Sequence, residues 1–145
     1  MSYELRDHTA DVAVEATGPT LESVFAAAGD GLAAAMCEEI PEAGGERFEF
    51  EVRAEGREAL LFDYLDDLIY ERDVRSVLPV DNEVEIREPE RGDEDGESGE
   101  WALEASARGL PLADISAREI KAVTYSEMAL EETESGWRAY VVFDV

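Results

Sequence analysis

The chain has 145 residues, with 37 acidic side chains against 12 basic ones and a formal net charge of -25 at pH 7. Its length and its hydrophobic fraction of 45% suffice for a core, so we expect one domain over residues 1–145. Such negative charge repels phosphate backbones, which argues against direct binding of RNA or DNA. It also favours a salt-rich cytoplasm, as in a halophile, where salt screens repulsion within the chain.

The remaining composition points to a cytoplasmic protein. The single cysteine, Cys37, cannot form a disulfide within the chain, and its place at the end of an apolar helical stretch predicts a buried position. The first residues, MSYELRD, lack the basic and apolar regions of a secretion signal, and no apolar run approaches the length of a membrane span. We therefore expect no membrane association.

The first part of the chain predicts two strands and a helix. Residues 3–17 favour two short strands around the segment HTAD at 8–11. Gly18-Pro19 then breaks the second strand, and Thr20 can cap a helix. The apolar positions of this helix follow helical spacing: Leu21, Val24, Phe25, Ala28, Leu32, Ala35 and Met36.

A strand, a second helix and two short strands are expected next. Strict alternation over residues 46–54 predicts a half-buried strand. Residues 58–72 return to helical spacing, and residues 77–80 and 84–86 favour two short strands. The inward positions of the helix are Leu61, Tyr64, Leu65, Leu68 and Ile69.

The last third of the chain is predicted to be mostly strand. Residues 88–100, rich in acidic side chains and glycine, predict a mobile loop. Alternation resumes over residues 101–107, one or two strands follow over 118–134, and residues 137–145 form the last strand. Together these elements predict an α+β fold, a two-layer sandwich in which one mixed, mostly antiparallel sheet carries both helices on one face.

His8 and Asp11 in the HTAD segment are the first candidate site residues. A histidine beside a carboxylate can act as a metal ligand or as an acid-base pair. The same residues can also serve only the backbone of a turn between two strands.

Asp144 and Val145 form a second candidate site at the end of the sequence. A carboxylate next to a terminal backbone offers several hard oxygen atoms in a small volume, which suits Ca²⁺ or Mg²⁺ better than zinc. The alternative is a solvated chain end.

Lys121, in the segment EIKAVTY, is the only lysine of a chain that uses arginine elsewhere. It is either a retained functional cation or a solvated surface charge. Glu119, in the same segment, is a supporting candidate.

Four blocks of the sequence resemble the archease family: HTADVAVEATG, LLFDYLDDLIYERDV, EIKAVTY and WRAYVVFDV. The resemblance implies the archease fold and a non-catalytic activator of the RtcB-type tRNA-splicing ligase. Such an activator promotes guanylylation and multiple turnover of the ligase and broadens its nucleotide specificity. The resemblance further implies that Asp11, Asp144 and the backbone oxygen of Val145 bind a divalent cation such as calcium, and that Lys121 takes part in activation.

The sequence also departs from the family pattern at two places. Many archeases carry a histidine where this chain has Ser126, and a further histidine where this chain has residues 113–119. Any role of those histidines cannot be transferred to this chain. Two other functions stay open: a small metal-dependent hydrolase that uses Asp11, His8 and Asp144, and a halophilic protein-binding module without a ligase role.

Overall fold

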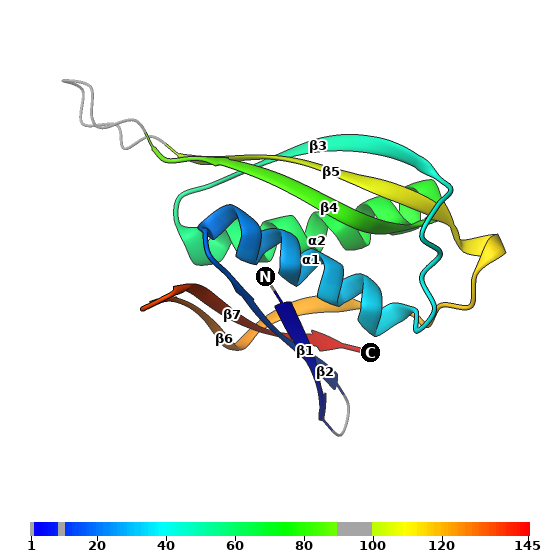
Figure 1. The fold of residues 1–145 in the computed structure, drawn as a ribbon, viewed down its shortest axis with the longest axis horizontal. Coiled ribbons are helices and arrows are strands. Elements are labelled where there is room, and N and C mark those ends of the chain that lie inside the picture. The colour runs from blue at the N-terminus through cyan, green and yellow to red at the C-terminus, as the bar shows by residue number, and fades with distance from the viewer. Residues whose placement is uncertain (1, 9–10, 90–99) are drawn as a thin grey trace.

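The computed structural model describes residues 2–8, 11–89 and 100–145 (Figure 1). Seven strands, two α-helices and one short 3-10 helix follow one another along these residues. In chain order they are β1 (Ser2–His8), β2 (Asp11–Gly18), α1 (Leu21–Met36), β3 (Glu46–Ala54), α2 (Arg57–Arg75), β4 (Val77–Arg87), β5 (Trp101–Pro111), η1 (Leu112–Asp114), β6 (Ala122–Thr133) and β7 (Gly136–Asp144). Among the described residues, neither α-helix combines the length and the apolar character that a membrane span requires.

The strands form two antiparallel sheets with the two helices between them (Figure 1). The four-stranded sheet has the order β1-β2-β7-β6, and the three-stranded sheet has the order β3-β5-β4. The predicted α+β sandwich is therefore confirmed. The prediction of a single sheet with helices on one face is corrected, because alternation shows which face of a strand is buried but not which strands pair.

Helix α1 is buried on almost all sides because it contacts both sheets. It packs against β2 on one side and against β4 on the other. A side chain at Gly29 would come within 2.5 Å of the Tyr64 hydroxyl, and one at Gly31 would come within 2.5 Å of Val14. The helix is thus apolar around most of its circumference, as expected for a helix enclosed in a core.

The start of α1 follows the predicted cap. The backbone N–H of Ser23 donates to the Thr20 hydroxyl at 3.1 Å, and the Thr20 N–H donates to the Ser23 hydroxyl at 2.9 Å. This reciprocal capping satisfies two backbone donors that a helix leaves without partners. After the helix, Cys37 is buried as predicted.

Two of the predicted strand regions differ in detail from the structure. Residues 77–87 form one strand, β4, with an irregularity between Val80 and Glu83 instead of a break. Strand β6 is also continuous, but its pairing with β7 shifts between Thr124 and Ala129. The acidic loop predicted at 88–100 falls mainly on residues 90–99, which lie outside the described residues.

Candidate functional site

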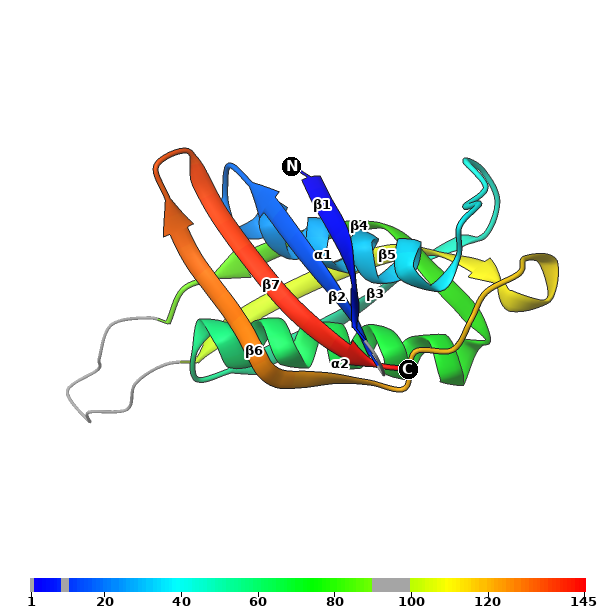
Figure 2. The same cartoon turned by 90° about the horizontal axis from the view of Figure 1, so that it is seen from below.

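The candidate site lies at one end of the four-stranded sheet, where the hairpin of β1 and β2 adjoins the last strand (Figure 2). Asp11 is the register partner of His8 on β1 and of Asp144 on β7, and Asp144 is also the partner of Ala122 on β6. Directly paired residues of antiparallel strands lie about 4.5–5.5 Å apart at Cα. The fold therefore places the two predicted aspartates next to each other, although 133 positions separate Asp11 and Asp144 in the sequence.

The two aspartates occupy the outer face of this sheet, away from the helices. Their neighbours Val12 and Phe143 are also register partners, and both belong to the buried core. Because side chains alternate along a strand, Asp11 and Asp144 point to the opposite face. Asp11 is half-buried and its Oδ1 atom is shielded from solvent, whereas Asp144 and Val145 are exposed.

The backbone of Lys121 lies next to that of Asp144. The Lys121 N–H donates to the backbone oxygen of Asp144 at 2.8 Å, which extends the pairing of β6 with β7 by one residue. The Lys121 side chain is exposed, and it makes no ion pair with a carboxylate in the part of the chain that the structure describes. Its ammonium is thus available to a ligand or a partner.

The supporting candidates His8 and Glu119 are less clearly part of the site. The backbone of His8 lies in β1 opposite Asp11, and its side chain is outside what the structure describes. Glu119 is exposed and lies two residues before Lys121 in an irregular segment. Of the predicted site residues, the structure brings the aspartates and the backbone of Lys121 into one cluster.

The donor atoms of this cluster fit a hard cation with an incomplete shell. Asp11 and Asp144 offer four carboxylate oxygens, and Val145 adds a backbone oxygen beside them. Within the described part of the chain, no three His, Cys, Asp or Glu side chains gather closely enough to hold a metal by themselves. Because Ca²⁺ takes about 6–8 oxygens, water or a second protein would have to supply the rest.

A separate group of carboxylates lies on α2. Burial, together with the charges of Glu71, Asp66 and Asp63, raises the pKa of Asp67 to about 6. Burial, together with the charge of Asp66, also raises the pKa of Asp63. This face of the helix therefore carries negative charge that opposes the folded state near neutral pH.

We predict that Asp67→Asn stabilises the protein at pH 7. A carboxylate with a raised folded-state pKa contributes stability below about pH 4, the unfolded value, and that contribution is lost as pH rises through about 6. The difference in the free energy of unfolding between the variant and wild type should therefore grow by about 1 kcal/mol in favour of the variant as pH rises from 4 to 7. This figure allows for solvent screening. Urea denaturation of both proteins across this range measures the difference, with Asp114→Asn as the exposed control. A difference in the free energy of unfolding that does not change with pH would contradict the prediction.

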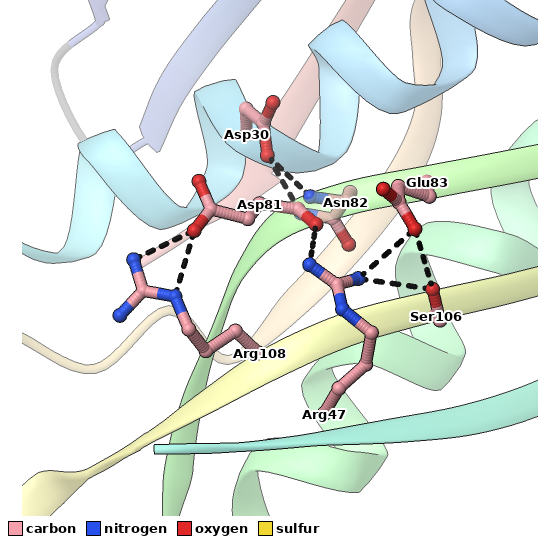
Figure 3. Close-up of polar contacts among 7 residues, drawn as sticks. All are labelled: Asp30, Arg47, Asp81, Asn82, Glu83, Ser106 and Arg108. Atoms are coloured by element: carbon pink, nitrogen blue, oxygen red, sulfur yellow. Dashed lines mark hydrogen bonds and ion pairs between the residues drawn. The ribbon is translucent and has the colours of Figure 1, made fainter. Parts of the chain in front are cut away.

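A second polar cluster, at the irregularity of β4, has a structural role (Figure 3). Asp30 on α1 accepts hydrogen bonds from the backbone N–H of Asn82 at 3.0 Å and from its side chain at 2.9 Å. Arg108 forms an ion pair with Asp81 at 2.7 Å, and Arg47 donates to the Asp81 carbonyl at 3.1 Å. Asp81 has a φ of 51°, so these contacts hold a strained turn of the backbone.

Sequence reasoning missed one buried charged residue, Arg72 on α2. Its exposed fraction is only 5%, and its guanidinium reaches the segment that precedes Lys121. Its spacing was a usable signal, because Leu61, Leu65, Leu68 and Arg72 follow one another at helical intervals on the buried stripe. A charged residue in such a stripe indicates a specific polar partner.

The chain matches a known family model almost from end to end. Residues 3–145 match the model described as the Archease protein family (MTH1598/TM1083). The curated "Protein archease" of Methanosarcina mazei is 35% identical over 147 residues, covering 99% of this chain and 95% of that protein. The "Protein archease" of Thermococcus kodakarensis is 33% identical, with 99% and 98% coverage.

Two solved structures share the fold. The solution structure of Methanobacterium thermoautotrophicum protein 1598 has a TM-score of 0.77 and 26% identity, and covers 99% of this chain and 98% of that one. The crystal structure of a Thermotoga maritima protein, described as an archease and possible chaperone, has a TM-score of 0.61 and 22% identity, with 98% and 96% coverage. With the family match over nearly its whole length, the chain belongs to the archease family.

Proposed function

We propose that this chain is a non-catalytic activator of an RtcB-type tRNA-splicing ligase. In this role it promotes guanylylation and multiple turnover of the ligase and broadens the range of nucleotides that the ligase accepts. The observation that carries the proposal is the meeting of Asp11, Asp144 and Lys121 at one end of one sheet. Blocks from the two ends of the sequence thus contribute to one small surface.

In this proposal Asp11, Asp144 and Val145 hold a divalent cation, calcium in the first place and magnesium as the alternative. When bound, the cation offers open coordination positions to oxygen atoms of a partner. The exposed carboxylate of Asp144 and the half-buried one of Asp11 supply the protein's charge at this point. Their placement on the outer face leaves the site open to a second protein.

Lys121 supplies the positive charge of the proposed surface. Its exposed ammonium is a compact point charge on a flexible stem, which suits contact with a phosphate oxygen or a partner carboxylate. The backbone bond to Asp144 holds the start of this stem beside the proposed cation site. Lys121 would therefore act on the ligase or its nucleotide next to the cation.

The charge of the whole chain supports a protein partner over a nucleic acid. A net charge of -25 opposes direct contact with RNA, so the ligase would carry the RNA contacts itself. In a salt-rich cell long-range steering is weak, because the Debye length is about 3 Å at 1 M salt. Docking would then depend on short-range packing and on the cation site.

We expect this chain to raise the rate of multiple-turnover ligation by its cognate ligase in molar potassium chloride. Lys121→Ala should lose on the order of tenfold of this stimulation, the scale of a typical coupling between sites. Arg87→Ala is the matched control, because it removes an exposed positive charge from the three-stranded sheet. Ligation and ligase guanylylation are measured with each protein.

Each possible result of these measurements tests a different part of the proposal. A ligase that turns over equally fast without the chain would refute the activator role and leave the binding-module alternative. Full stimulation by Lys121→Ala would refute the role of this residue while the activator role stands. Hydrolysis of phosphate esters by the chain alone, lost in Asp11→Asn, would favour the hydrolase alternative.

A further inference from the structure

Arg72 is a charged residue inside the core, with a hydrogen bond to the backbone beside the proposed site. Its Nη1 donates to the Ile120 carbonyl at 2.8 Å and contacts the Met36 sulfur at 3.2 Å. Its Nε and Nη2 contact Asp73 at 2.9 and 2.8 Å. The guanidinium is therefore satisfied on both sides, by the next carboxylate of its own helix and by a backbone carbonyl far along the chain.

The burial of Arg72 is explained by the carbonyl and not by the ion pair. The Asp73 side chain is 64% exposed, so this pair could form equally well at the surface of the helix. Burial of a guanidinium is unfavourable unless its donors find partners that the surface does not offer. The partner inside the protein is Ile120, which is fully buried.

The peptide group between Ile120 and Lys121 is held from both sides. Its carbonyl oxygen accepts from Arg72, and its N–H donates to the backbone oxygen of Asp144. These two bonds fix the plane of the peptide from which the Lys121 side chain starts. They connect α2, through one peptide unit, to the strand that carries Asp144.

The residue that begins this segment is anchored as well. The Arg118 N–H donates to the Met36 carbonyl at 2.7 Å, and its Nε donates to the Ala35 carbonyl at 2.9 Å. Residues 118–121 therefore have fixed partners on α1, α2 and β7, although they form no regular element. Among these contacts, the hydrogen bond from Arg72 is the only one in which a side chain binds the peptide group between Ile120 and Lys121.

We propose that Arg72 is a positioning residue, which orients Lys121 for the activation of the ligase. This inference rests on the proposed function in its last step only, since the orientation of the peptide can be measured without a ligase. A lysine at position 72 keeps the charge but loses the planar fork that contacts Asp73 and Ile120 together. Without that contact the carbonyl of Ile120 is buried and loses its partner, and the peptide can turn.

Amide hydrogen exchange, followed by NMR in molar potassium chloride, tests the orientation. In Arg72→Lys the Lys121 amide should exchange about tenfold faster or more than in wild type, because a hydrogen bond to a charged donor is lost. The amide of Val141, inside the pairing of β2 with β7, should keep its wild-type rate. Equal acceleration of both amides, or no change at Lys121, would overturn the proposal.

Three further variants keep the test decisive. Arg75→Lys alters the exposed arginine of the last turn, which pairs with Glu71, and should leave the Lys121 amide unchanged. Asp73→Asn removes the exposed partner of Arg72 but not the Ile120 contact, and should also leave it unchanged. If Arg72→Lys does not fold, Arg72→Gln, which keeps a smaller uncharged donor, is measured in the same way.

The ligation assay tests the functional step. Arg72→Lys should reduce stimulation of the ligase by a factor similar to that of Lys121→Ala, whereas Arg75→Lys should stimulate as wild type does. Full stimulation by Arg72→Lys, with faster exchange at Lys121, would refute the functional step. Absence of stimulation by wild type would refute the proposed function, and the exchange rates would still decide whether Arg72 orients the peptide.

Discussion

Replacing Asp144 by Asn should weaken calcium binding by about 10- to 100-fold, because a cation site loses affinity steeply when it loses a charged ligand. Asn keeps the size of the side chain and one oxygen, so the fold of β7 should persist. Asp11→Asn should have a similar effect, since Asp11 is the register partner of Asp144 on the neighbouring strand. Isothermal titration calorimetry with calcium in molar potassium chloride measures the affinity of each variant.

The control for this prediction is Asp66→Asn, which removes the same charge from an exposed position on α2. Its calcium affinity should equal that of wild type, which separates direct coordination from a general change in net charge. Equal affinities of wild type and of the double variant Asp11→Asn, Asp144→Asn would remove the cation from the proposed site. The activation of the ligase by the double variant then shows whether the carboxylates act without a cation.

Replacing Gly136 by Ala should destabilise the protein by about 3 kcal/mol or more, through backbone strain and steric overlap. Gly136 has a φ of 149°, a conformation that side chains disfavour. An added methyl group would also overlap the backbone oxygen of Gly18 and lie 2.7 Å from the Cα of Pro19. Backbone atoms cannot move aside as the end of a side chain can, so the turn between β6 and β7 would have to shift.

Gly56→Ala is the matched control for the turn. Gly56 has a φ of -140°, and a methyl group there would meet no atom within 4 Å. Urea denaturation should therefore show only a small change for Gly56→Ala and a large loss for Gly136→Ala. Equal losses in the two variants would contradict the argument from sterics.

The turn at Gly136 also sets the register of the nearer part of β6. Thr133 pairs with Gly136 and Ala129 pairs with Tyr140, before the pairing shifts between Thr124 and Ala129. A slip of one residue would move the side chains of residues 129–133 to the opposite face. The pairing of Ala122 with Asp144 lies beyond this irregularity.

Local patterns in the sequence were enough to predict most of the elements and the main candidate residues. Alternation of apolar and polar residues predicted β3 and β7, and helical spacing with the Thr20 cap predicted α1, because these patterns depend only on neighbours along the chain. The four family blocks indicated the archease family, which the comparisons confirm. They also indicated Asp11, Asp144 and Lys121, whose roles remain predictions.

The pairing of the strands and the contacts that support the site are visible only in the folded chain. Two separate sheets enclose the helices, since the pairing of strands depends on contacts between distant residues that local alternation does not encode. The role of Arg72 also depends on a contact between distant residues, because its partner Ile120 lies 48 residues away along the chain. Its helical spacing placed it on the buried stripe, but only the fold shows that its guanidinium holds the peptide of the chain's single lysine.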